Sequence, residues 1–272
     1  MENRDIPRAT YIPAEGVISE MASWGRRRID ELGWPKILIL GMMGGAFITA
    51  GALFSLLLGS GVESPGVRLF VEGFGFSAGF FFVVLSEAAL FTEANVVMPA
   101  ALLSRESETV KVFRFWGLAL AGNVIGAVLL GVVVAKVGHY SAEYTGLLEE
   151  IVEFKLSFQD GGVGGWFEAL LSGVAANWLV GMAAFFGTMG RTIFGKYIPV
   201  LLAVSTFIAA GFQHSPANFG YFSLAWFGGT QLSVWDVVVW NLIPAGLGNV
   251  IGGTFLVALP FWYIWGRRDT YG

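Results

Sequence analysis

The sequence predicts an all-α polytopic membrane protein whose six transmembrane helices form two inverted repeats of three. Three observations predict this class: long runs without charge, a pentapeptide that occurs twice, and polar residues within two otherwise apolar runs. Of the 272 residues, 55% are hydrophobic and 13% are charged, whereas soluble domains carry about 25% charge. No soluble domain of useful size fits outside the apolar runs.

The apolar runs are long enough to cross a bilayer, because about 20 apolar residues span its hydrocarbon core as a helix. A run at 69–85 contains one charged residue, Glu72, and five further runs contain none: 37–62, 115–135, 169–190, 198–227 and 237–266. Six helices are therefore predicted within one transmembrane domain, residues 35–272.

Residues 1–34 form a separate N-terminal segment that lacks the continuous apolar stretch of a signal peptide. Within it, residues 13–33 have the pattern of an amphipathic helix, with these apolar residues among charged ones: Val17, Ile18, Met21, Trp24 and Ile29. Such a helix can lie in the membrane interface.

The basic residues predict the orientation of the chain. With six crossings both termini share one side, and 13 of the 16 Lys and Arg residues fall on that side, leaving only Arg68, Lys136 and Lys155 on the other. Basic residues favour the cytoplasmic side. We therefore expect a multi-pass protein of the cell (inner) membrane with both termini in the cytoplasm.

An internal repeat follows from two matches in register. The pentapeptide GNVIG occurs at 122–126 and 248–252, and the dipeptide Ala-Asn at 94–95 and 217–218, with offsets of 126 and 123. Residues 37–137 and 166–266 are therefore interpreted as two copies of one three-helix unit. Because three is odd, the second copy enters the membrane in the opposite sense, an arrangement typical of transporters and channels.

The second span of each copy is expected to be broken. Residues 85–100 bring several polar residues into an apolar run, and residues 212–218 (FQHSPAN) do the same in the second copy. Pro216 lacks an N–H group and disfavours a helical conformation at the residue before it. One helix should therefore end near His214 and another begin near Pro216. Irregular backbone at membrane depth occurs where it is buried or lines a cavity, so these breaks predict a permeation site.

His214 is the only ionisable side chain of its span. Polar residues inside membranes mark pathways, and an imidazole can donate a hydrogen bond to an anion or pass a proton. The alternative is a buried structural histidine whose hydrogen bonds are satisfied. Both interpretations place it in the protein interior.

Four motifs in order resemble the formate/nitrite transporter family: LFT at 90–92, AANWLVG at 175–181, FQHSPAN at 212–218 and NLIPAGLGNVIGG at 241–253. The resemblance covers about residues 30–270. It implies an aquaporin-like fold, a homopentamer with one pore in each protomer, and passage of small monovalent anions or their acids, such as formate and nitrite. No cofactor, metal or nucleic-acid partner is expected, only a small solute and the lipid bilayer.

The resemblance also implies roles for matching positions. His214 matches the central pore histidine, Thr92 the loop residue that faces it, and Asn177 a polar partner from the fourth span. Leu90 belongs to the same LFT motif and is counted among the pore residues.

Further pore residues follow from the same resemblance. The narrow aromatic constriction corresponds to Phe76, Phe80 and Phe207. Lys155 matches a vestibule lysine that attracts anions, and residues 156–165, which follow it, are interpreted as an insertion.

Two acidic residues depart from the family pattern. The residue before the LFT motif is Ala89 instead of an acid, the residue after it is Glu93 instead of Gly or Ser, and an acid lies earlier, at Glu87. This pattern is more similar to the YfdC-like branch of the family than to its formate or nitrite channels. Glu93 would repel anions if ionised, so it is expected to be protonated, or paired with a basic residue such as Arg105 or Arg114. Two roles stay open for it: a hydrogen-bond acceptor that holds the loop in place, or a change of substrate toward cations or neutral solutes.

The sequence thus predicts a channel or transporter in which Lys155 concentrates an anion that crosses with a proton. Two alternatives stay open: a channel for neutral or cationic solutes of the ammonia type, and a closed membrane scaffold. An enzyme is not expected, because the chain has no cysteine and its two histidines are far apart.

Overall fold

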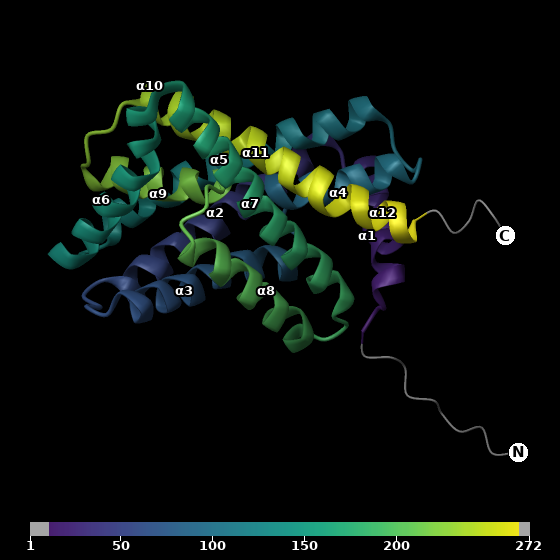
Figure 1. Ribbon diagram of the computed structural model, residues 1–272, viewed down its shortest axis with the longest axis horizontal. Helices are drawn as coiled ribbons and strands as arrows, with labels where there is room; N and C mark the ends of the chain where they lie inside the picture. The colour runs from purple at the N-terminus through teal and green to yellow at the C-terminus, as the bar shows by residue number, and fades with distance from the viewer. Residues whose placement is uncertain (1–10, 267–272) are drawn as a thin grey trace, which may run out of the picture.

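A bundle of helices is formed by residues 11–266, the part of the chain that the computed structural model describes (Figure 1). Among these residues, five helical stretches are long and apolar enough to cross a membrane: 34–59, 65–86, 109–137, 142–189 and 234–265. The first three are single helices: α2 (Trp34–Gly59), α3 (Pro65–Ser86) and α5 (Thr109–Val137). The remaining predicted span, 198–227, is absent from this set because it is divided between two shorter helices.

The chain leaves helical geometry at the two places where breaks were predicted. In the first half, α3 (Pro65–Ser86) is separated from α4 (Phe91–Leu103) by residues 87–90, which we call the first joint. Glu87 ends α3 in a left-handed conformation, with φ of 55°. Pro99 lies inside α4 and does not interrupt it.

In the second half, α8 (Ile193–Ala209) is separated from α9 (Ser215–Gly228) by residues 210–214, which we call the second joint. Pro216 lies in the first turn of α9, where its missing N–H is not needed by the helix. The predicted start of this helix is therefore confirmed.

Both copies of the GNVIG pentapeptide pack against the first helix of their own half. The second copy lies in α11 (Ile243–Gly253) and faces α7 (Gly162–Met189). A Cβ atom on Gly126 would contact the Met42 carbonyl of α2, and a Cβ atom on Gly252 would contact the Val174 carbonyl of α7. Glycine thus lets the helix backbones approach closely. In lipid, helices associate through such close packing because no hydrophobic effect drives them together. The opposite sense of the second copy stays a prediction.

The last helical stretch is irregular. It begins with a short turn, α10 (Val234–Asp236), and contains two π-helical segments on either side of α11: η2 (Val237–Leu242) and η3 (Thr254–Ala258). It ends in α12 (Leu259–Trp265). Such π segments occur frequently at functional sites.

The predicted amphipathic helix is present as α1 (Ala14–Glu31). Its apolar face is buried against the protein, mainly on α4, with these residues fully covered: Val17, Ile18, Met21 and Ala22. The Ile12 N–H donates to the Met189 carbonyl, and α1 also contacts α12. The first and last described helices therefore lie together (Figure 1), which agrees with the predicted even number of crossings.

A helix that the sequence did not predict connects the two halves. This helix, α6 (Ala142–Leu156), leads through a 3₁₀ turn, η1 (Ser157–Gly161), directly into α7. Its buried face packs on α9, and Ser141 caps its first turn by accepting a hydrogen bond from the Tyr144 N–H. The predicted insertion, 156–165, forms the junction between α6 and α7, and α6 carries Lys155.

Candidate functional site

The first turn of α4, directly after the first joint, meets the second joint through a buried side-chain contact. Thr92 Oγ1 and His214 Nε2 are 2.8 Å apart, and the two residues are 0% and 1% exposed. His214 is also the N-cap of α9, because its Nδ1 accepts a hydrogen bond from the Ala217 N–H at 3.3 Å. With Nδ1 accepting, Nε2 carries the proton and donates to the threonine hydroxyl. The juxtaposition that the sequence predicted is present.

The first joint is held by an asparagine from the pentapeptide repeat. Asn123 Oδ1 accepts a hydrogen bond from the Phe91 N–H at 2.9 Å, and Asn123 Nδ2 donates to the Ala89 and Gly41 carbonyls, each at 2.8 Å. Non-helical backbone has no helical partners for its N–H and C=O groups. One side chain from α5 therefore satisfies both sides of the break next to Thr92.

The second joint is held in the same way by the equivalent asparagine. Asn249 Oδ1 accepts from the N–H and the hydroxyl of Ser215, both at 2.8 Å. Asn249 Nδ2 donates to the Gln213 carbonyl at 3.0 Å and to the Gly173 carbonyl at 2.8 Å. The sequence revealed the repeat but not this role, although asparagine is the only polar side chain within GNVIG.

Asn177 lies between the two halves. Its Nδ2 atom donates to the Thr92 carbonyl at 3.2 Å and to the Asn249 carbonyl at 2.6 Å. The predicted polar partner from α7 therefore contacts the backbone of Thr92 rather than its hydroxyl, and it links the threonine to the asparagine that holds the second joint.

Aromatic rings cover the Thr92–His214 pair on one side. The Phe207 ring lies 5.1 Å from the imidazole of His214 and 5.8 Å from the ring of Phe76, measured between centroids. Phe80, one helical turn beyond Phe76, and Leu90, the residue directly before α4, are buried in the same core. These side chains form an apolar layer.

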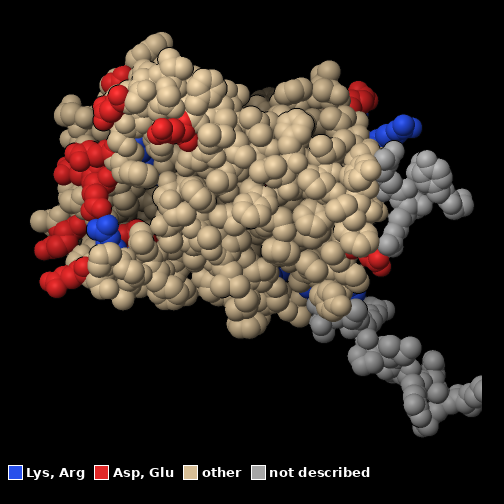
Figure 2. All heavy atoms as spheres, viewed as in Figure 1, with Lys and Arg blue, Asp and Glu red and all other residues tan. Residues whose placement is uncertain are grey.

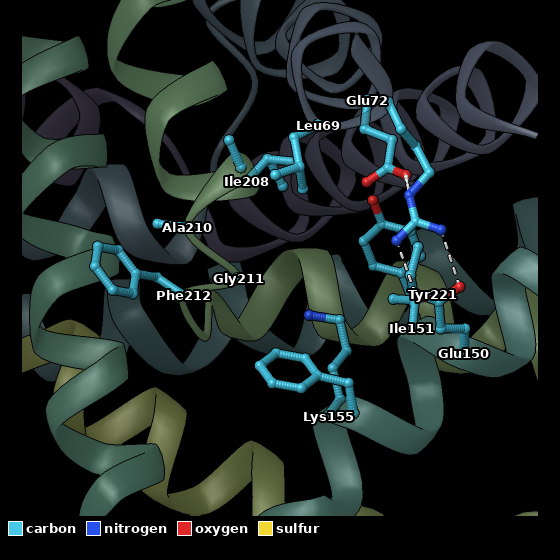
Figure 3. A pocket seen from close by; sticks show the side chains of 13 residues that line it. Leu69, Glu72, Glu150, Ile151, Lys155, Ile208, Ala210, Gly211, Phe212 and Tyr221 are labelled. Atoms are coloured by element: carbon cyan, nitrogen blue, oxygen red, sulfur yellow. Dashed lines mark hydrogen bonds and ion pairs between the residues drawn. The ribbon is translucent and has the colours of Figure 1, made fainter. Parts of the chain in front are cut away.

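Beyond this layer lies a cavity of about 510 Å³, the Lys155 cavity (Figure 3). Its floor includes Tyr221 of α9, whose ring stacks on Phe76 with a centroid separation of 6.1 Å. The amine of Lys155 points into this space and lies 5.2 Å from the centroid of the Tyr221 ring. The amine of Lys155 therefore lies next to Tyr221, the ring that stacks on Phe76 of the aromatic layer.

The buried amine of Lys155 is surrounded by neutral amides. Lys155 Nζ donates to Asn218 Oδ1 at 2.7 Å, and among residues 11–266 it forms no ion pair with a carboxylate. Asn218 is held in turn by Gln213 Oε1 at 3.0 Å and by Asn241 Oδ1 at 2.6 Å. Asn241 comes from the π-helical segment η2 and also donates to the Lys155 carbonyl at 2.7 Å. The sequence did not reveal this role of Gln213 and Asn241.

The rim of the Lys155 cavity carries charges of both signs. Arg68 forms two hydrogen bonds to Glu150, at 2.8 and 3.1 Å, and its Nε lies 3.5 Å from a carboxylate oxygen of Glu72. Acidic side chains gather at this end of the molecule (Figure 2), among them the exposed residues Glu63, Glu143, Glu149, Glu150, Glu153 and Asp160.

A second cavity, of about 330 Å³, lies on the side of the first joint that faces α1; we call it the Glu93 cavity. Its charged lining residues are Glu20, Arg27, Glu87, Glu93, Arg191 and Lys196.

Glu93 is paired, but not with the residues proposed from the sequence. Its carboxylate lies 3.6 Å from Nη1 of Arg28, with both side chains less than 10% exposed. Neither Arg105 nor Arg114 forms this pair. Arg28 reaches Glu93 because it extends the buried face of α1, eleven residues after Val17, and α1 packs on α4. The helical spacing of Val17, Met21 and Arg28 was the signal that could have revealed it.

These features define the class of protein: a multi-pass membrane protein in which two broken helices meet at a buried polar pair, as in channels and transporters. A neighbour of His214, Phe212, lines one cavity, and the neighbour of Thr92, Glu93, lines the other. The chain belongs to the formate/nitrite transporter family, whose model matches residues 15–263. The assignment to a YfdC-like branch stays a prediction.

Curated relatives agree with this membership. The chain is 30% identical over 257 residues to an uncharacterized transporter of Bacillus subtilis, YrhG, covering 93% of each chain. It is 29% identical over 233 residues to a formate-nitrite transporter of Entamoeba histolytica, covering 84% of this chain and 64% of that protein. To the formate channel FocA of Escherichia coli K12 it is 27% identical, covering 87% of this chain and 88% of that one.

Solved structures share the fold. An FNT family ion channel superposes with a TM-score of 0.81 at 21% identity, covering 91% of this chain and 98% of that chain. A pentameric formate channel with formate bound gives a TM-score of 0.72 at 23% identity, covering 86% and 98%. The all-helical channel fold of the family is therefore present.

Proposed function

We propose that this chain forms a channel for small monovalent anions or their weak acids, with formate and nitrite as the first candidates. The contact between Thr92 and His214 carries this proposal, because it places two hydrogen-bonding side chains between the Lys155 cavity and the Glu93 cavity. Membership of the family and the relatives named as formate channels support the same substrate class.

The geometry suggests how an anion is brought to the aromatic layer. The amine of Lys155 lacks a carboxylate partner among the described residues and stands next to Tyr221. It attracts an anion that has entered the Lys155 cavity, whose rim holds Arg68 between the carboxylates of Glu150 and Glu72.

The aromatic layer then selects the neutral form. A bare anion between the rings of Phe76 and Phe207 would lose its hydration without receiving a compensating charge, which is heavily penalised. Protonation removes most of this penalty. We propose that the solute crosses with a proton supplied by bulk water or through His214, while Thr92 and the backbone held by Asn177 orient it.

The assembly and its orientation are part of the proposal. A homopentamer in the inner membrane, with α1 and α12 on the cytoplasmic side, agrees with the distribution of basic residues and with the pentameric formate channel that shares the fold. Light scattering of the purified protein gives the subunit number, and labelling of introduced single cysteines from either side gives the orientation.

The function is tested by uptake of formate, nitrite and acetate into proteoliposomes at two pH values. We expect saturable anion uptake that rises as the external pH falls, and a changed pH dependence in His214→Asn. Pentamers that conduct glycerol, urea or ammonia but none of the anions would support the neutral-solute alternative instead. Pentamers that conduct nothing at either pH would support a closed scaffold.

A further inference from the structure

An acidic residue follows directly after Thr92 in the first turn of α4. Glu93 is 4% exposed and lines the Glu93 cavity, at the end of the proposed pathway opposite Lys155. An ionised carboxylate at this place opposes the passage of any anion that has reached Thr92, because the surroundings screen charge weakly.

One side chain from outside the transmembrane domain faces this carboxylate. The guanidinium of Arg28 lies 3.6 Å from Glu93 through Nη1, and its Nη2 donates to the Glu87 carbonyl at 3.1 Å. It is stacked between two aromatic rings, 4.7 Å from the centroid of Trp24 and 5.3 Å from that of Phe115. The aromatic contacts and the two polar contacts fix the cation in place.

We infer that Arg28 is a specificity-determining residue, which cancels the charge of Glu93 and so leaves the Glu93 cavity passable to anions. The inference rests on the proposed function and names the part of the chain that sets its charge selectivity. With Arg28 included, four basic side chains face three acidic ones around the cavity. Without Arg28, the basic and acidic side chains around the cavity are equal in number, and Glu93 has lost its partner.

The charge interpretation differs from a purely structural one in a measurable way. If the buried ion pair only stabilises the fold, removing either partner destabilises the protein. If instead the cation offsets a carboxylate in an anion pathway, the two partners have opposite effects on transport: loss of Arg28 slows anions, whereas loss of Glu93 does not.

The test is equilibrium exchange of labelled formate across proteoliposomes, which does not depend on how the protein is oriented. We expect Arg28→Gln to slow exchange at least tenfold, Glu93→Gln to exchange at the wild-type rate or faster, and Arg28→Gln/Glu93→Gln to return to within about threefold of wild type. Arg26→Gln is the matched control: Arg26 lies on the same helix, is half-exposed, and pairs with Glu106 at 3.3 Å. This control should exchange like wild type.

Each other outcome has a definite meaning. Equal losses in the two single variants, or a double variant as slow as Arg28→Gln, would overturn the inference and leave only a structural contact to Glu93 or to the Glu87 carbonyl. Wild-type protein without formate exchange would overturn the proposed function and this inference together. If Arg28→Gln does not assemble, Glu93→Gln and the double variant decide, since slow exchange in either contradicts the inference.

Discussion

Removing the Asn249 side chain should loosen the joint that carries His214. The amide of Asn249 supplies the hydrogen-bond partners of the Ser215 N–H and the Gln213 carbonyl, at 2.8 and 3.0 Å. Both groups flank the break between α8 and α9 and are buried, so neither water nor a helix replaces the partner. The substitution Asn249→Ala leaves the two groups unsatisfied.

The magnitude follows from these two groups. A buried backbone group without a partner costs about 1–3 kcal/mol, so the free energy of unfolding should fall by about 2–6 kcal/mol. Of the two other partners of this amide, the Gly173 carbonyl lies inside α7 and keeps its helical hydrogen bond, whereas the Ser215 hydroxyl also loses its acceptor. For a chain of this size, 1 kcal/mol corresponds to about 2–4 °C in melting temperature, which gives a decrease of about 4 °C or more.

The assay is thermal unfolding of the purified protein in detergent, with formate exchange measured on the same preparation. Asn123→Ala is the internal comparison, because Asn123 holds the Phe91 N–H and the Ala89 carbonyl in the first joint. We expect a similar decrease for it. Gln231→Ala changes an exposed amide and should melt like wild type. An Asn249→Ala protein that melts within 1 °C or so of wild type would refute the reasoning.

Three further predictions concern the pathway and the packing. Thr92→Val removes the acceptor of the buried His214 Nε2–H, so formate exchange should fall about tenfold or more without loss of assembly; unchanged exchange would contradict the role of the hydroxyl. Lys155→Met should slow uptake most at low ionic strength, because salt screens the attraction that the amine provides, whereas Lys155→Arg should stay near wild type; a salt-independent defect would count against attraction. Gly252→Leu should prevent close packing of α11 on α7 and abolish the folded protein in size-exclusion chromatography, whereas Gly246→Leu, which has open space around it, should assemble normally.

Much of the fold could be predicted from the sequence, because the bilayer imposes a simple length rule on apolar helices. Four of the predicted spans became helices with ends shifted by a few residues, and the breaks fell where polar residues entered the runs. The helix α6 was not predicted, since its charged residues resemble those of a solvated loop. Its buried face packs against α9, a contact that the sequence alone does not show.

The candidate site was predicted in part. Thr92 and His214 were paired through the family resemblance, and the structure places them in contact. The predicted partners of Glu93, Arg105 and Arg114, were wrong. The N-terminal helix was interpreted as an interfacial element, whereas the stripe of buried residues on this helix continues to Arg28, the actual partner. A basic side chain on an apolar stripe signals a buried partner, but the sequence alone does not identify that partner.

The central claim, that the two joints hold Thr92 and His214 side by side in the permeation pathway, can be tested with a metal bridge. The chain has no cysteine, so Thr92→Cys introduces a single thiol next to the imidazole nitrogen that now lies 2.8 Å from the threonine hydroxyl. A thiolate and an imidazole together bind soft divalent cations such as Zn²⁺ and Cd²⁺. We expect micromolar Cd²⁺ to block formate exchange through Thr92→Cys, and to leave both wild type and Thr92→Cys/His214→Asn unaffected. A conducting Thr92→Cys protein that Cd²⁺ does not block, or a block that persists without the histidine, would contradict the claim.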